Sequence, residues 1–177
     1  IERAVEDSLR RLQTDVIDLY QSHWMDPATP HEATLEAYDR LMKAGKVRAI
    51  GASNFDAANL KQALDVSASK GIARYETLQP HYNLYSRSTF EGALQDLAVA
   101  EGLGVITYFS LESGFLTGKY RSVADLEGAA RGGGMKNKFD ARGLRILAVL
   151  DAVAQRNDAP PPSPADDRTR PRSCAHR

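Results

Sequence analysis

Residues 16–24, VIDLYQSHW, begin with a predicted strand over 16–20 that is apolar except for Asp18, and continue to the polar pair Ser22 and His23 beside the aromatic Trp24. A nearly continuous apolar run of this length is typical of a buried strand in a parallel sheet, because such a strand is covered on both faces. The carboxyl ends of parallel strands are where α/β proteins usually carry their functional groups. A single histidine at a strand end is more often a structural residue, so its interpretation depends on how the other strands end.

Three further strands are expected, over residues 47–52, 75–78 and 105–109. The four predicted strands start about 30 residues apart, and apolar residues recur at helical spacing before, between and after them. Helices are therefore expected over about 1–13, 30–45, 56–69, 88–102 and 144–153. Thr29 with Glu32, and Ser88 with Glu91, have the spacing of a helix capping box.

Strands that alternate with helices in this way predict an α/β fold with a parallel sheet and right-handed crossovers. Two architectures fit this pattern, an open doubly wound sheet and a (β/α)8 barrel. No Gly-x-Gly-x-x-Gly follows any predicted strand, which argues against a Rossmann dinucleotide-binding domain.

Composition excludes several classes of partner. The 177 residues are 42% hydrophobic and 26% charged, and 23 basic residues balance 23 acidic ones. We therefore expect no nucleic acid partner. No apolar run reaches the roughly 20 residues of a membrane span, and no signal peptide is recognisable. Cys174 is the only cysteine, so an internal disulfide is impossible and a reducing, cytoplasmic location is expected.

Two segments depart from the βα pattern. Residues 121–142 lose the periodicity and contain three consecutive glycines at 132–134, which predicts a mobile loop: a surface connection or, alternatively, a flap over a cofactor. Residues 158–177 hold five of the eight prolines and no large apolar side chain. Such a Pro- and Arg-rich segment is predicted to be a disordered tail, and its abrupt change of composition suggests a shifted reading frame.

Polar side chains also end the other predicted strands. The full set is His23, Ser53, Asn54, Gln79, Tyr108 and Ser110. In a barrel they would meet at one rim. There an imidazole can hydrogen-bond a carbonyl oxygen, Ser, Asn and Gln can pair with a planar amide, and a Tyr ring can stack on a flat heteroaromatic. Together these groups suit nicotinamide, and Lys119 could meet a phosphate. Each residue also has a structural alternative: Ser53 or Asn54 as a helix cap, Gln79 as a backbone partner, and Lys119 as a solvated surface charge.

Four motifs in order carry a family resemblance: residues 18–24 DLYQSHW, 45–55 GKVRAIGASNF, 79–84 QPHYNL and 114–120 GFLTGKY. Over about residues 1–157 the chain resembles an aldo-keto reductase, nearest the branch that includes voltage-gated potassium channel β subunits and related bacterial oxidoreductases. The resemblance implies a partial (β/α)8 barrel with about strands four to seven. It also implies hydride transfer between NADPH and a small aldehyde or ketone.

The resemblance assigns roles to single residues. His23 matches the active-site histidine that helps orient the substrate carbonyl. Ser53, Asn54 and Gln79 match residues that bind the nicotinamide carboxamide, and Tyr108 matches the aromatic that stacks on the ring. The remaining cofactor residues implied are Phe109, Ser110, Leu111 and Lys119. Of these, Leu111 and Lys119 match positions that line the pyrophosphate and ribose of the cofactor. Phe109, and also Glu112, differ from the small residues that are commoner at these positions in the family. No metal site is expected.

The family's proton-donating Tyr, with its Lys and Asp, lies in βα units that precede the first strand of this chain. We expect the chain to be truncated at both ends and to lack this general acid. General acid catalysis contributes about a hundredfold to ten-thousandfold to the rate. The chain by itself is therefore not expected to reduce 4-nitrobenzaldehyde with NADPH. A non-catalytic, cofactor-sensing partner subunit and a non-functional gene fragment are the alternative interpretations.

Overall fold

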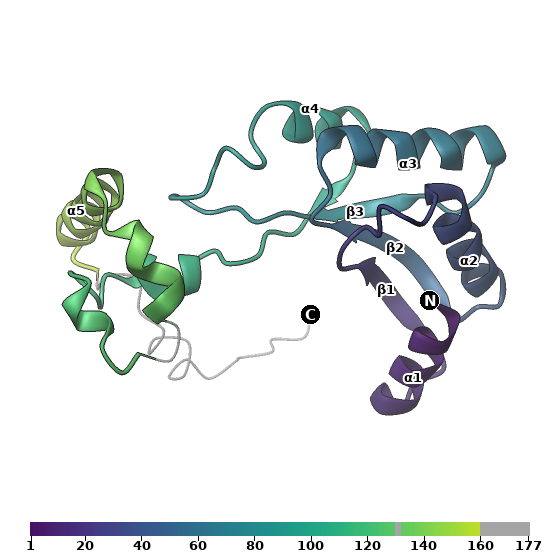
Figure 1. The fold of residues 1–177 in the computed structure, drawn as a ribbon, viewed down its shortest axis with the longest axis horizontal. Helices are drawn as coiled ribbons and strands as arrows, with labels where there is room; N and C mark the ends of the chain where they lie inside the picture. The colour runs from purple at the N-terminus through teal and green to yellow at the C-terminus, as the bar shows by residue number, and fades with distance from the viewer. Residues whose placement is uncertain (130–131, 160–177) are drawn as a thin grey trace. The chain divides into compact units, whose positions relative to one another are not determined.

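A computed structural model of the chain describes residues 1–129 and 132–159 (Figure 1). The predicted tail over 158–177 lies outside the described residues except for its first two positions. The chain divides into two compact units. Unit 1 consists of residues 1–81 and 88–108, and unit 2 consists of residues 82–87 and the described residues from Phe109 onward.

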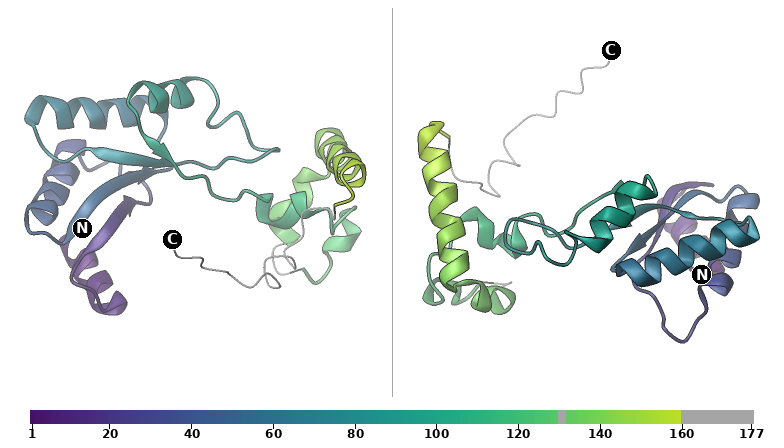
Figure 2. Two further views of the ribbon diagram at one scale, coloured as in Figure 1. Left: turned by 180° about the vertical axis from the view of Figure 1, so that it is seen from behind. Right: turned by 90° about the horizontal axis from the view of Figure 1, so that it is seen from above.

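Unit 1 is built on a four-stranded sheet in the order β1-β2-β3-β4 (Figure 2). The strands are β1 (Ile17–Ser22), β2 (Val47–Ser53), β3 (Tyr75–Gln79) and β4 (Gly104–Val105). All three pairings are parallel, so the predicted α/β fold with a parallel sheet is confirmed.

The predicted fourth strand is wrong in its extent. Only Gly104 and Val105 form β4, and Tyr108 pairs with His81 as a single isolated bridge. Val105 and Ile106 are 40% and 43% exposed. Little apolar surface is therefore buried by these residues, and nothing favours a longer strand at this edge of the described sheet.

Four helices belong to unit 1: α1 (Glu2–Leu12), α2 (His31–Lys43), α3 (Ala57–Lys70) and α4 (Ala93–Ala100). Most of their buried side chains follow the apolar periodicity, with Val5 in α1, Leu35 in α2 and Leu60 in α3 fully buried, whereas Leu12 at the end of α1, which the same periodicity places on the apolar face, is 64% exposed. Helices α2 and α3 lie along the same side of the sheet (Figure 1), as consecutive right-handed crossovers require.

Both predicted capping boxes are wrong. The hydroxyl of Thr29 donates to the carboxylate of Asp26 at 2.7 Å, and α2 has no side-chain cap. The helix predicted from residue 88 begins only at Ala93, after Gly92. A side chain of the right type has several acceptors or donors within reach, so spacing alone does not fix the cap. Helix α3, in contrast, is capped by Asp56, whose carboxylate accepts the backbone N–H of Asn59 at 2.7 Å.

A hydroxyl cluster joins β1 to its neighbours in unit 1. The Ser22 Oγ lies 2.9 Å from the Tyr38 hydroxyl and 3.0 Å from the Tyr75 hydroxyl, so that α2 and β3 share one partner on β1. Burial raises the pKa of Tyr75 to about 12, although the hydrogen bond with Ser22 opposes this shift. The cluster supplies buried hydroxyls with partners, as a packed interior requires.

Unit 2 contains three 3-10 helices and one α-helix. They are η1 (Glu112–Thr117), η2 (Ala124–Leu126), η3 (Gly132–Lys138) and α5 (Ala141–Arg156). A small core holds them together, formed by Phe115, Leu116, Leu126, Met135 and Leu147. Although residues 121–142 were expected to form a mobile loop, their described part contains two of these helices, and Met135 is 1% exposed. This segment therefore contributes to the core of unit 2.

Candidate cofactor-binding site

The predicted site residues fall into two groups, one in each unit. The first group lies at the carboxyl ends of the strands of unit 1. Ser53 and Gln79 are register partners on β2 and β3, and the hydroxyl of Ser53 donates to the backbone carbonyl of Gln79 at 2.9 Å. The strand ends therefore converge as predicted from the parallel sheet.

Asn54 links the ends of β1 and β2 to Tyr108 through its side-chain amide. Its Nδ2 donates to the carbonyl of His23 at 2.9 Å and to the Oγ of Ser53 at 3.2 Å, and its Oδ1 accepts the hydroxyl of Tyr108 at 2.6 Å. The backbone φ of Asn54 is 58°, a left-handed conformation that asparagine tolerates better than most residues. Both amide protons are used within the protein, so Asn54 holds the rim together and keeps only acceptor capacity for a ligand.

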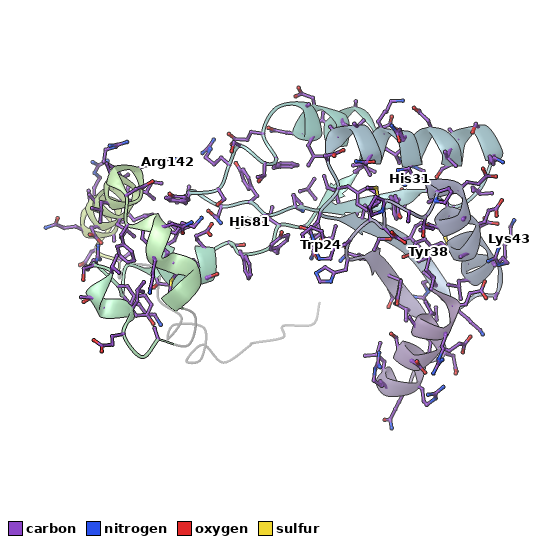
Figure 3. The ribbon with its side chains drawn as sticks, viewed as in Figure 1. Trp24, His31, Tyr38, Lys43, His81 and Arg142 are labelled. Atoms are coloured by element: carbon purple, nitrogen blue, oxygen red, sulfur yellow. The ribbon has the colours of Figure 1, made fainter. Side chains whose placement is uncertain are left out.

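Gln79 and His23 provide the uncommitted side chains of this group. Within the described residues, neither the amide of Gln79 nor the imidazole of His23 has a side-chain hydrogen bond. His23 is exposed after the end of β1, and its ring lies 5.8 Å from that of Trp24, centroid to centroid (Trp24 is labelled in Figure 3). The rim thus offers one amide donor and acceptor pair and one imidazole to a ligand.

The ring of Tyr108 is fixed on two sides. Its hydroxyl is held by Asn54, and one face stacks on His81 with the ring centroids 5.2 Å apart and the planes 14° apart (His81 is labelled in Figure 3). The hydrogen bond with Asn54 and the stacking with His81 therefore fix the orientation of this ring at the rim.

The second group lies in unit 2, where Phe109, Ser110, Leu111 and Lys119 all line one cleft of about 750 Å³. Gly114, Thr117 and Met135 are further lining residues. The structure therefore brings together all four residues of this group. A cleft of this size falls within the range of small-molecule sites.

The polar groups of the cleft suit an anion. The Lys119 Nζ lies 4.6 Å from the centre of the Tyr120 ring, and it makes no ion pair within the described residues. The backbone N–H groups of Ser110 and Leu111 likewise have no acceptor in the described part of the chain. A free ammonium group with two neighbouring free N–H groups is a donor set that phosphates use.

The wall of the cleft has an unusual backbone. Phe109, Glu112 and Ser113 have φ values of 55°, 46° and 58°, and Gly114 has a φ of 106°. Non-glycine residues in this region each cost of order 1 kcal/mol or more, and such residues tend to gather at functional sites.

The backbone of Glu112 belongs to this wall, but the residue is not among those that line the cleft. Its carboxylate accepts hydrogen bonds from the Asn83 Nδ2 at 2.6 Å and the Ser86 Oγ at 2.8 Å, and it pairs with the Lys138 Nζ at 3.2 Å. Burial acts to raise the pKa of Glu112, but the hydrogen bonds from Asn83 and Ser86 and the charge of Lys138 outweigh it, and the pKa is lowered.

Comparison with known proteins identifies the family. The model of the aldo/keto reductase family matches residues 1–165. This chain belongs to the aldo/keto reductase family.

Three relatives illustrate the match. The aldo-keto reductase YhdN of Bacillus subtilis is 43% identical over 128 residues, which are 72% of this chain and 37% of YhdN. The NADH-specific methylglyoxal reductase of Escherichia coli is 32% identical over 158 residues, or 88% of this chain and 45% of that protein. The structure of the glycerol dehydrogenase of Gluconobacter oxydans superposes with a TM-score of 0.74 at 31% identity, covering 90% of this chain and 47% of that one. This aldo/keto reductase chain thus spans less than half the length of these relatives, and its four parallel strands form part of a (β/α)8 barrel.

Within each unit, the residues present fit one part of a nicotinamide dinucleotide, the cofactor type of the family. The Gln79 amide carries the donor and acceptor that a carboxamide pairs with, and the cleft with Lys119 carries donors for a pyrophosphate. In the part of the chain that the structure describes, no group of three or more His, Cys, Asp or Glu side chains could hold a metal ion. No described helix combines the length and the apolar character that crossing a membrane demands.

Sequence analysis missed the residues that support the cleft from behind. Asn83, Ser86 and Lys138 have no common spacing or motif and come together only in the folded unit. A weak signal was present, because Glu112 places a charge inside the otherwise uncharged run 109–118. A charge in such a run must find a partner when it is buried.

Proposed function

We propose that this chain forms the nicotinamide-binding part of an oxidoreductase that transfers hydride between NADPH and a small aldehyde or ketone. The observation that carries the proposal is the convergence of amide, hydroxyl and imidazole groups at the ends of the parallel strands. Membership of the aldo/keto reductase family supports it.

The residues of unit 1 have complementary tasks in this proposal. Gln79 pairs with the carboxamide and so fixes the plane of the nicotinamide, while Asn54 holds the surrounding strand ends in place. Tyr108, oriented by Asn54 and His81, contributes the aromatic ring beside the nicotinamide. The imidazole of His23 donates a hydrogen bond to the substrate carbonyl oxygen and orients it. When bound, the reduced nicotinamide supplies the hydride.

Lys119 and the neighbouring backbone N–H groups serve the phosphates of the cofactor in unit 2. A charge-assisted contact of this kind contributes about 1.5–3 kcal/mol, against about 0.5–1.5 kcal/mol for a neutral hydrogen bond. We therefore expect Lys119 to contribute more to cofactor affinity than Gln79. Gln79, in contrast, should provide selectivity for the nicotinamide end.

The test is a calorimetric titration of the full chain with NADPH, with NADH and with 2′-phospho-ADP-ribose, which lacks the nicotinamide. Gln79→Ala should weaken NADPH binding by about three- to tenfold and leave the binding of 2′-phospho-ADP-ribose unchanged. Lys119→Met should weaken both by about ten- to a hundredfold.

Two outcomes would contradict the proposal. One is the absence of saturable binding of either nicotinamide cofactor to the parent chain. The other is an equal loss of affinity for both ligands in Gln79→Ala, since that would mean that Gln79 does not contact the nicotinamide.

A further inference from the structure

The structure assigns Glu112 a positioning role: its carboxylate, held by Asn83 and Ser86, fixes the strained backbone wall of the cleft in unit 2 for binding the pyrophosphate of a dinucleotide. This inference rests on the proposed function, which makes that cleft the phosphate site. It goes further in assigning a task to a residue that does not touch the cleft.

The first step of the argument is the direction of the side chain. The backbone of Glu112 lies between the cleft-lining residues Leu111 and Ser113, yet its side chain is only 6% exposed and its carboxylate contacts Asn83, Ser86 and Lys138. A buried carboxylate costs several kcal/mol unless it is paired and hydrogen-bonded. Here it joins three segments of unit 2 at the back of the wall.

The second step is the backbone strain. Three non-glycine residues of the wall, Phe109, Glu112 and Ser113, have positive φ values. Strained backbone of this kind persists only where surrounding contacts over-determine it. Asn83 supplies two of these contacts, because its Nδ2 donates both to the carbonyl of Phe109 at 2.9 Å and to the carboxylate of Glu112.

Asn83 is itself anchored at its acceptor side. Its Oδ1 accepts the backbone N–H groups of Tyr85 and Ser86, each at 2.8 Å. The turn over residues 83–86 therefore forms a rigid base that holds the wall at both Phe109 and Glu112. The free N–H groups of Ser110 and Leu111 lie between these two anchored positions. The positions of the phosphate donors are thus set by contacts on the far side of the loop.

Lys138 serves a different purpose in this arrangement. Its side chain is 15% exposed, and its Nζ lies 4.4 Å from the centre of the Tyr85 ring as well as beside Glu112. The lysine neutralises the buried carboxylate. Removing the charge of one partner alone would weaken the compensation of the other, buried charge and would destabilise unit 2, which would obscure any effect on the cleft.

The experiment therefore compares two double variants in one background. Glu112→Gln with Lys138→Met removes both charges but keeps an oxygen that accepts from Asn83 and Ser86. Glu112→Ala with Lys138→Met removes both charges and that oxygen. Asp151→Asn, which breaks the exposed Arg121–Asp151 pair elsewhere in unit 2, is the control for the loss of an ion pair.

Two quantities are measured on the full chain at a temperature where all variants are folded. The first is the affinity for NADPH. The second is the rate of amide hydrogen exchange at Glu112, Gly114 and Leu116, whose backbone hydrogen bonds lie within the wall. The Gln/Met variant and Asp151→Asn should bind NADPH within about threefold of the parent, with unchanged exchange. The Ala/Met variant should bind about tenfold more weakly, with exchange at these amides faster by a similar factor.

Equal NADPH affinity and equal exchange in the two double variants would overturn the positioning role while leaving the proposed function intact. Faster exchange in the Ala/Met variant with unchanged affinity would also overturn it, since Glu112 would then stabilise the wall without serving the ligand. Failure of the parent chain to bind NADPH would instead refute the proposed function and this inference with it.

Discussion

Gly51 in the middle of β2 offers a sharp test of how the sheet of unit 1 is packed. It lies in register between Gln21 on β1 and Thr77 on β3. A Cβ at this position would stand 2.9 Å from the Oε1 and 3.0 Å from the Cγ of Gln21, and closer still to the Oγ1 of Thr77. Gly51→Ala therefore requires Thr77 or the strands themselves to move.

The expected cost follows from two opposing effects. Overpacking by one methyl group in a well-packed interior costs typically about 1–3 kcal/mol, occasionally more. The φ of Gly51 lies outside the left-handed region, so the exchange also stabilises by about 0.4–1 kcal/mol through the unfolded chain. Because neighbours on both sides are compressed, we expect a net destabilisation of about 2 kcal/mol.

Urea denaturation followed by far-UV circular dichroism measures this effect. With a typical urea dependence of about 1–3 kcal/mol/M, the midpoint should fall by about 1 M. In a Thr77→Ala background the nearest obstacle is gone, and the same exchange should cost less than half as much. A Gly51→Ala chain within about 0.5 kcal/mol of the parent, or a penalty of equal size in the Thr77→Ala background, would refute this account of the packing.

Two pH effects follow from the shifted ionisations. Tyr75 has a pKa of about 12 in the folded state and about 10 when unfolded. The stability that it contributes is therefore present below pH 10 and is lost between about pH 10 and 12. In denaturation curves, Tyr75→Phe should remove on the order of 2 kcal/mol from the fall in the free energy of unfolding over this range. Glu112 has a lowered pKa in the folded state, so its contribution is present above about pH 4.3 and is lost as the pH falls through the folded value. The stability of Glu112→Gln should depend less on pH in this acidic range than that of the parent, and parallel acid-denaturation curves would contradict the ion-pair assignment.

How much of the fold could be predicted depends on the range of the interactions involved. Apolar periodicity predicted the buried faces of the helices, because burial of Leu35 or Leu60 requires only that the right side of the helix faces the sheet. Helix starts were predicted less well, since the Thr29 hydroxyl donates to Asp26 and α2 has no side-chain cap. The fourth strand was predicted too long because the apolar and β-branched residues of 105–109 favour a strand by their own preference. Whether these residues are buried depends on the elements packed beside them, and Val105 and Ile106 are exposed at this edge of the described sheet.

The candidate site divides in the same way. The convergence of Ser53, Asn54 and Gln79 follows from one rule, that parallel strands end on the same edge, so sequence reasoning could bring them together. The use of each side chain could not be predicted. Asn54 was expected to contact a ligand with its amide, but its two donors are used within the rim, since the carbonyl of His23 is placed there by a strand 31 residues away.

Asn54 and Glu112 represent two solutions to one physical problem, namely how to hold non-glycine backbone at positive φ where ligand-facing groups must be placed. Asparagine accepts this conformation at low cost and then hydrogen-bonds its neighbours. Glutamate has no such preference, so its conformation must be stabilised by Asn83, Ser86 and Lys138, which lie outside the cleft. It follows that a change to Lys119 should act by removing a charge from the cleft, whereas changes to this anchoring set should act by altering the order of the wall. Both kinds of change should weaken the binding of every pyrophosphate-containing ligand, but only the second should change amide exchange in the wall.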